Sequence, residues 1–253
     1  MTSEFKGKTA LITGAASGIG AAVARALAEH GAAHLTLVDR DEERLAALDL
    51  PCKTSRHAGD VGDEDLWNAI EQEGRALDAA FLNAGIAGTA APLAKLALHD
   101  WRRVMGVNLD GLFLSLRTAM RLARDGSAMV VTASVAGLKA EPGIGPYGAS
   151  KAGAIQLAKI AAKEGAPRRI RVNAIAPGGV DTAIWDGMPF FEELKAKHQG
   201  DRAGALDALA SGMTPMGRFE TAEEIAAQVL FLLSPASGTM TGATLVSDGG
   251  YSL

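Results

Sequence analysis

The stretch YGASK at 147–151 carries the pair of side chains best suited to chemistry in this chain. Tyr147 and Lys151 are four residues apart, so on a helix they project from the same face. A phenol has a pKa of about 10, and it must fall by about 3 before the phenol can exchange a proton with an alcohol near neutral pH. A neighbouring ammonium favours that fall. The pair alone leaves open an ordinary helix with a packed tyrosine and a solvated lysine.

Two further polar residues are candidates for the same site. Ser134 ends the apolar run SAMVVTAS at 127–134, where its hydroxyl could hold a substrate oxygen beside the phenol. Asn108 lies in the apolar stretch VMGVNLDGLF, although asparagine is unfavourable inside a helix because its amide competes for backbone hydrogen bonds. The plainer alternatives are a loop serine and a buried amide that is satisfied locally.

A glycine-rich stretch, TGAASGIG at 13–20, follows one predicted strand and opens a predicted helix. Glycines let the backbone turn tightly and come close to a ligand. The free N–H groups and the partial positive charge at a helix N-terminus suit a pyrophosphate. This placement favours a dinucleotide site over a glycine-rich turn without a ligand.

Asp39 ends the second predicted strand and indicates which dinucleotide is bound. A carboxylate there accepts hydrogen bonds from the adenosine ribose hydroxyls and repels a 2′-phosphate, which favours NAD over NADP. Arg40 could hold that phosphate, but Ala15, Ala16 and Ser17 add no positive charge. We therefore predict NAD, with NADP less favoured. Methyltransferases share a glycine loop and an acid after the second strand, and Tyr147 distinguishes the chain from them.

Apolar strands alternate with helical patterns along most of the chain. We predict strands at 9–13, 34–39, 77–83, 127–134, 170–177 and 243–248, and helices at 18–30, 63–74, 99–124, 147–165 and 221–233. This order is typical of an α/β protein with a Rossmann-type, doubly wound parallel sheet of about seven strands and helices on both faces. We expect one domain over 1–253, in which residues 178–220 break the alternation and hold a substrate-loop insertion at about 183–220.

The insertion is rich in large apolar side chains. It and its flanks hold Trp185, Phe190, Phe191 and Phe219, together with Met188, Met213 and Met216. We expect an apolar, adaptable lid over a bulky or cyclic substrate. The alternative is that these residues only pack the lid onto the domain. The predicted substrate-binding residues are Ser134, Tyr147, Trp185, Met188, Phe190 and Phe191.

Composition excludes several other classes. The net charge is −4, the pI is about 5.8 and no basic run occurs, so we do not expect nucleic acid binding. No apolar run approaches the roughly 20 residues that a membrane helix needs. The single cysteine, Cys52, favours a cytoplasmic location, and with scattered histidines it gives no indication of a metal site.

Taken in order, these motifs resemble the short-chain dehydrogenase/reductase family, in its single-domain branch of about 250 residues. The resemblance runs from about residue 5 to 250 and includes TGAASGIG (13–20), GDV (59–61), NAG (83–85), Asn108, Ser134, YGASK (147–151), PGGVDT (177–182) and DGG (248–250). One departure is Leu82, where the family often has a second asparagine before NAG. A hydrogen bond that braces neighbouring strands is expected to be missing there.

The resemblance implies a role for each matching residue. Tyr147 would be the general acid/base, Lys151 would hold the nicotinamide ribose and lower the pKa of Tyr147, Ser134 would orient the substrate oxygen, and Asn108 would support a water relay. Asp60 and Val61 would contact the adenine, and Pro177 to Thr182 the nicotinamide. The implied cofactor-binding set is Gly14, Ser17, Gly18, Ile19, Asp39, Arg40, Asp60, Val61, Asn83, Ala84, Gly85, Tyr147, Lys151, Pro177, Gly178, Val180 and Thr182.

The resemblance also suggests substrate and assembly. Residues 161–189 resemble hydroxysteroid and cyclic-alcohol dehydrogenases, which implies a secondary alcohol or ketone substrate. A sugar or polyol dehydrogenase is the nearest rival, and an NADPH-dependent 3-oxoacyl carrier-protein reductase is a third. A non-catalytic dinucleotide sensor would be expected to lose Tyr147 or Lys151. By family analogy we expect a homotetramer, with a homodimer as the alternative.

Overall fold

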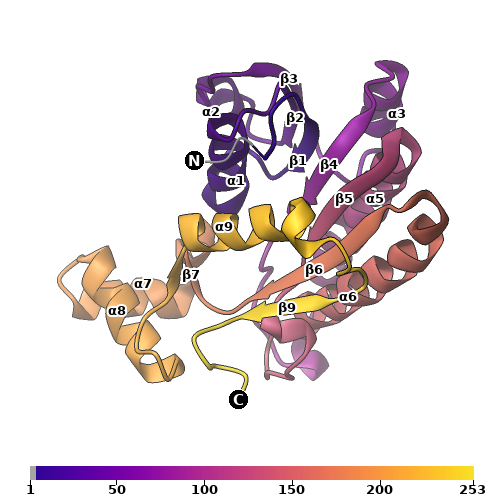
Figure 1. Cartoon of the computed structure of the whole chain (residues 1–253). Helices are drawn as coiled ribbons and strands as arrows, with labels where there is room; N and C mark the ends of the chain where they lie inside the picture. Colours follow the sequence, from indigo (N-terminus) through magenta and orange to yellow (C-terminus); the bar gives the residue numbers. More distant parts are fainter. Residues whose placement is uncertain (1–3) are drawn as a thin grey trace.

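The computed structural model describes residues 4–253 and is built on one seven-stranded parallel sheet in the order β3-β2-β1-β4-β5-β6-β9 (Figure 1). The strands are β1 Thr9–Thr13, β2 His34–Asp39, β3 Lys53–Ala58, β4 Leu77–Leu82, β5 Ala123–Thr132, β6 Arg171–Pro177 and β9 Thr244–Ser247. Every pairing in the sheet is parallel. The predicted α/β, doubly wound fold is confirmed.

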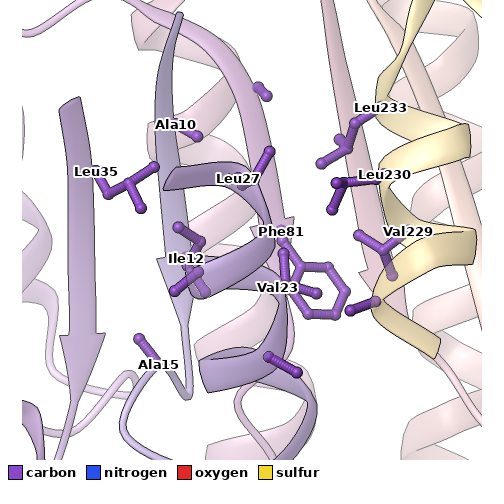
Figure 2. Packing of buried hydrophobic residues seen from close by; sticks show 14 of the residues in the cluster. Ala10, Ile12, Ala15, Val23, Leu27, Leu35, Phe81, Val229, Leu230 and Leu233 are labelled. Carbon is purple, nitrogen blue, oxygen red and sulfur yellow. The ribbon is translucent and has the colours of Figure 1, made fainter. Parts of the chain in front are cut away.

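Helices cover both faces of the sheet, as the alternation of buried strand residues requires. Ile12 faces a cluster formed with α1 (Gly18–Glu29), α2 (Glu42–Ala47) and α9 (Ala222–Leu233). Figure 2 shows Val23 and Leu27 on this side, with Val229 across from Phe81. The neighbouring Leu11 faces the other cluster, to which three further helices contribute. These are α3 (Glu64–Gln72), α5 (Gly111–Leu122) and α6 (Gly145–Gly165).

The single helix predicted over 99–124 is wrong in its continuity. The segment forms α4 (Leu98–Met105), a π-helical turn at Gly106–Asp110 and α5, after which the chain enters β5 at Ala123. The amide of Asn108 bonds to backbone outside the helix. A π turn accommodates that side chain with one wider turn, and such turns are frequent at functional sites.

Two elements between β2 and β4 were not predicted, because their sequences contain no apolar run. β3 has the polar sequence KTSRHA because it is the edge strand of the sheet. α2 is only six residues long and is capped by Asp41, whose side chain accepts from the Arg44 N–H. Short 3-10 turns connect several of the helices and strands: η1 Leu93–Lys95, η3 Val135–Gly137, η4 Ala166–Arg168, η5 Ala183–Trp185 and η6 Pro235–Ser237.

Residues 183–219, called the lid below, lie outside the main sheet. They contain α7 (Pro189–Lys197) and α8 (Arg202–Met213), which Figure 1 shows in light orange to the side of the sheet. The lid is flanked by β7 (Val180–Asp181) and β8 (Glu220–Thr221), which pair in parallel as a separate two-stranded sheet. Neither these helices nor any other in the described part of the chain is long and apolar enough to cross a membrane.

Candidate active site

Tyr147 and Lys151 project from the first turns of α6, which begins at Gly145 with Pro146 in its first turn. The Lys151 ammonium lies 5.7 Å from the centre of the Tyr147 ring. Ser134 follows the end of β5, caps η3 through the Ala136 N–H at 3.2 Å, and hydrogen-bonds to the Tyr147 side chain. Ser134 from the end of β5 thus meets Tyr147 and Lys151 from the start of α6 at the carboxyl end of the sheet, where parallel α/β folds bind ligands.

Burial controls the protonation of this pair. It raises the pKa of Tyr147, and the hydrogen bond from Ser134 opposes this rise without reversing it. Burial lowers the pKa of Lys151 to about 8. Desolvation is thus the largest influence on the phenol, and the lowering of its pKa by Lys151 together with a bound nicotinamide stays a prediction.

The Lys151 side chain lies between backbone at the end of β5 and backbone just after β4. Its Nζ donates to the Thr132 carbonyl oxygen at the end of β5, at 2.8 Å. Gly85, which follows β4, lies against it so closely that a Cβ there would be 3.4 Å from Nζ and 3.3 Å from Asn108 Oδ1. A larger residue at 85 would therefore push against both side chains.

Asn108 is fully buried and uses its whole amide. Its Oδ1 accepts from the Ile86 N–H at 2.8 Å, while its Nδ2 donates to the Ile86 carbonyl at 2.9 Å and to Ser150 Oγ at 3.2 Å. Ser150 in turn donates to the Tyr147 carbonyl at 2.7 Å. This chain of hydrogen bonds joins the π turn, the segment after β4 and the helix that carries Tyr147.

The glycine loop has the conformation that its sequence predicts. Gly14 has φ +64°, and a Cβ there would lie 2.9 Å from Asn83 Nδ2, so glycine is required for both reasons. Ser17 is exposed at the N-terminus of α1, and its side chain caps no N–H of that helix. The loop thereby leaves the first N–H groups of α1 open toward a ligand, with Ile19 partly buried behind them.

Asn83 and two threonines brace the strands beneath the loop. Thr13 Oγ1 accepts from the N–H groups of Asn83 and Ala84 at 2.8 and 3.0 Å. The Asn83 side chain donates to the Thr13 carbonyl at 3.3 Å and accepts from Thr132 Oγ1 at 3.1 Å. Leu82 is buried in the core instead, so this bracing runs through Asn83 without the family's usual second asparagine.

The predicted adenosine contacts lie at the ends of β2 and β3. The Asp39 carboxylate accepts from the Ala16 and Asp41 N–H groups at 2.9 and 3.0 Å, which fixes it beside the glycine loop. Arg40 is exposed. Asp60 accepts from the Gly62 N–H at 2.8 Å, and Val61 is buried with its carbonyl on Trp67 Nε1.

The predicted nicotinamide segment connects β6 to the lid. Pro177 ends β6, and the Gly178 N–H donates to the Ser247 carbonyl of β9 at 2.7 Å. Val180 is buried in β7. The Thr182 methyl would lie 3.2 Å from a Cβ at Gly18, so this segment crosses the start of α1. The structure thus brings residues 177–182 to the phosphate loop.

The predicted substrate residues of the lid divide into two groups. Trp185 stacks on Phe219 with ring centres 5.2 Å apart and an interplanar angle of 7°, and its Nε1 donates to the Val180 carbonyl. Phe191 is fully buried in the lid's own core, against which Met188 packs. Phe190 is 47% exposed. Packing thus accounts for Phe191, whereas Phe190 is open to contact.

The sequence prediction omitted four residues of this arrangement. Thr13 Oγ1 accepts from two backbone N–H groups, the Thr132 carbonyl accepts from Lys151 Nζ, and Ser150 Oγ donates to the Tyr147 carbonyl. Arg202 bonds to the segment at 181–186. Thr13 and Thr132 end apolar strands, and Ser150 lies inside the YGASK motif. These positions were the signal from which the sequence could have indicated the three residues. Within residues 4–253, no cluster of three or more His, Cys, Asp or Glu side chains could hold a metal ion.

Comparison with known proteins shows which family the chain belongs to. A family model described as enoyl-(acyl carrier protein) reductase matches residues 14–252. A cis-4-hydroxycyclohexanecarboxylate dehydrogenase of Sinomonas cyclohexanicum is 36% identical, over 99% of this chain and 99% of its own. A 3-oxoacyl-[acyl-carrier-protein] reductase of Thermotoga maritima is 38% identical, over 98% of each chain.

A solved structure agrees with these relatives. The L-sorbose reductase of Gluconobacter frateurii, determined with NADPH and L-sorbose, is 28% identical and superposes with a TM-score of 0.91 over 99% of this chain and 98% of its own. These matches span nearly the whole chain and join the Tyr147–Lys151–Ser134 geometry to enzymes that act on alcohols and ketones. The chain belongs to the short-chain dehydrogenase/reductase family, whose members bind nicotinamide dinucleotides and interconvert alcohols and carbonyl compounds.

Proposed function

We propose that this protein is an NAD-dependent dehydrogenase of a bulky, cyclic secondary alcohol, with Tyr147 as its general acid/base. The observation that carries the proposal is the meeting of Tyr147, Lys151 and Ser134 beside a glycine loop whose backbone is shaped for a pyrophosphate. The residues fit a dinucleotide, because the first N–H groups of α1 have no side-chain cap and the Asp39 carboxylate lies beside the glycine loop.

The chain's residues divide the work of proton transfer. When bound, the oxidised nicotinamide supplies the hydride acceptor and a positive charge. That charge favours the phenolate of Tyr147, whose pKa burial otherwise raises. Ser134 would donate a hydrogen bond to the substrate oxygen, and Tyr147 would accept the hydroxyl proton of the alcohol when it is oxidised. Lys151, whose Nζ donates to the Thr132 carbonyl and lies 5.7 Å from the centre of the Tyr147 ring, would hold the nicotinamide ribose.

Asp39 supports NAD as the cofactor. Both of its oxygens accept backbone N–H groups, which fixes the carboxylate at the loop where a 2′-phosphate would have to lie. Arg40 is the opposing residue, since its exposed guanidinium could reach that phosphate. The structural relative solved with NADPH keeps NADP as the alternative.

Apolar side chains support a bulky substrate. Leu93, Leu138, Ile184 and Phe190 are all more than 40% exposed. Leu93 packs against Gly145, two residues before Tyr147; Leu138 follows η3, and the other two belong to the lid. Exposed apolar groups on both sides of the site favour a ring over a polyol. The hydroxycyclohexanecarboxylate dehydrogenase agrees with this choice, and the L-sorbose reductase keeps a sugar as the second candidate.

Substitution of the two tyrosines tests the proposal. Tyr147→Phe should lower turnover by about 10²–10⁴-fold, the usual contribution of a positioned acid/base, and leave NADH binding within about twofold. Tyr251→Phe removes the other phenol of the chain and is the matched control. Turnover is followed at 340 nm with NAD and NADP on cyclic alcohols, hydroxysteroids and sugars, and binding by NADH fluorescence. Wild-type turnover in Tyr147→Phe would remove Tyr147 from the mechanism.

Assembly remains a prediction. Phe113 on α5 and Ile160 on α6 are exposed apolar residues on the two helices that the family analogy places between subunits. They support a homotetramer or a homodimer.

A further inference from the structure

Arg202, the first residue of α8, directs its guanidinium at one short segment of the chain. Its Nη1 donates to Asp181 Oδ1 at 2.7 Å, its Nη2 to the Thr182 carbonyl at 2.9 Å, and its Nε to Asp186 Oδ1 at 3.0 Å. One planar group therefore spans residues 181–186, where the chain leaves β7 and enters the lid.

The same segment contacts the phosphate loop on its other side. The Thr182 methyl lies over Gly18, the first residue of α1, whose φ is +50°. The Thr182 hydroxyl is turned toward the Ile184 N–H, at the edge of hydrogen-bonding distance, 3.5 Å. The segment thus lies between the glycine loop and α8, and Arg202 fixes it from the α8 side.

The other ion pairs of the lid do not make this link. Lys195 pairs with Glu192 within α7, at 2.8 Å. Arg218 pairs with Glu224 of α9, at 2.7 Å, and holds the far end of the lid. Among the ion pairs described for residues 183–219, those of Arg202 connect a lid helix to the segment beside Gly18.

Geometry matters more than charge at this link. The Arg202 side chain is 36% exposed, so solvent screens its ion pairs. Asp181, and then Asp186, raise the pKa of Arg202 through hydrogen bonds, so the group stays charged. Three fixed donors meeting three acceptors need the planar fork of arginine, which a lysine ammonium does not reproduce.

We infer that Arg202 is a positioning residue for the cofactor: its three hydrogen bonds hold Thr182 against the phosphate loop and so slow release of the dinucleotide. The inference rests on the proposed function, because it assigns the nicotinamide half of the site to residues 177–182. Arg202 contacts neither Tyr147 nor the glycine loop in this arrangement and acts through Thr182.

Dissociation of NADH, measured by stopped-flow fluorescence without substrate, tests the inference. Arg202→Lys and Arg202→Gln should each release NADH about tenfold faster, the effect of losing hydrogen bonds to charged groups. The KM for the dinucleotide should rise in proportion to the release rate. The fold decrease in kcat should be smaller than this fold increase in KM. Lys195→Gln breaks an ion pair inside the lid and should release NADH at the wild-type rate.

Two outcomes would overturn the inference. A wild-type release rate in Arg202→Lys would show that charge alone suffices, and equal acceleration in Lys195→Gln would show that any loosening of the lid has the same effect. Asp186→Asn removes one acceptor without changing Arg202, so it keeps the test open if the arginine variants fold poorly; it should accelerate release about threefold. Failure of the wild-type protein to bind NADH would instead overturn the proposed function.

Discussion

The glycine loop and the lid meet at Thr182 and Gly18, but they are built on different principles. The loop and its surroundings are joined to the main sheet by hydrogen bonds between buried groups, such as those of Asn108, Asn83 and Thr13. The lid has a small core of its own, formed by Phe191, Ala205, Leu206, Ala210 and Phe219, and partly exposed ion pairs connect it to its flanks. The cofactor half is thus fixed by the fold, whereas the lid's own core can change with little effect on it, because the contact between the two runs through Arg202 and residues 181–186.

This difference has an energetic consequence. Opening the lid exposes few buried side chains, while disturbing the loop disturbs strands that pair across the whole sheet. Local opening free energy follows the buried apolar contacts of a region. Substitutions in the cofactor half should therefore change catalysis or global stability, and those in the lid, apart from Arg202 with its bonds to residues 181–186, should change substrate affinity. The predictions below test this division.

The largest effect is expected at Lys151. Lys151→Met should lower turnover by about 10²–10⁴-fold and yet stabilise the fold. The folded-state pKa of about 8 lies below the ordinary 10.5, so the folded protein bears a cost for charging Lys151 at all pH values below 8. That cost is about 3 kcal/mol, less about 1 kcal/mol for the bond to Thr132.

The sign of this effect depends on pH. The gain in Lys151→Met should be complete below pH 8 and disappear as the pH rises toward 10.5, where the lysine is neutral in both states. Urea unfolding at pH 7 and at pH 10 measures it. A fall in the free energy of unfolding at pH 7 would show that the ammonium's hydrogen bond outweighs its burial.

A smaller effect is expected at Asp39. Asp39→Asn keeps an acceptor for the Ala16 N–H but removes the charge that repels a 2′-phosphate, so the ratio of kcat/KM for NADP to that for NAD should rise about tenfold or more. Arg40→Gln is the control and should move the ratio the other way or leave it unchanged. Equal ratios in wild type and Asp39→Asn would mean that Asp39 does not select the cofactor.

The smallest effect is expected inside the lid. Trp185→Phe keeps an aromatic ring against Phe219 and loses the Nε1 bond to the Val180 carbonyl. The KM for the alcohol should rise about threefold, as loss of one hydrogen bond implies, with the melting temperature unchanged. Thermal unfolding and steady-state kinetics check both parts. A drop in melting temperature of several degrees would show that the lid and the main sheet unfold together.

The sequence predicted the apolar strands well, because buried parallel strands leave continuous apolar runs. It also predicted α1, α3, α6 and α9, whereas the continuous helix over 99–124 was wrong. β3 escaped prediction because an edge strand with the sequence KTSRHA has no such run. The π turn escaped because nothing in VMGVNLDGLF distinguishes an amide that leaves the helix to reach Ile86 from one that stays within it. Long-range hydrogen bonds of this kind exist only once the sheet has formed.

The site was predictable where motif and spacing coincide, as at Tyr147 and Lys151. The raised pKa of Tyr147 was not, because it depends on how deeply α6 buries the phenol. The hydrogen bonds of Arg202 were equally hidden, because its acceptors at 181–186 lie across a turn whose shape the sequence does not predict. Burial and the partners of a flexible cation are products of the tertiary structure.

The order of the strands also determines when, during synthesis of the chain, each contact of the sheet can form. β9, residues 244–247, pairs with β6, residues 171–177, and between them come the lid and α9. Because the Gly178 N–H donates to the Ser247 carbonyl, residues 177–182 lack this contact with β9 until residues 244–247 have been synthesised. The nascent chain can form the glycine loop early, but contacts this distant in sequence form slowly. The contact between β6 and β9 is therefore expected to form after the glycine loop.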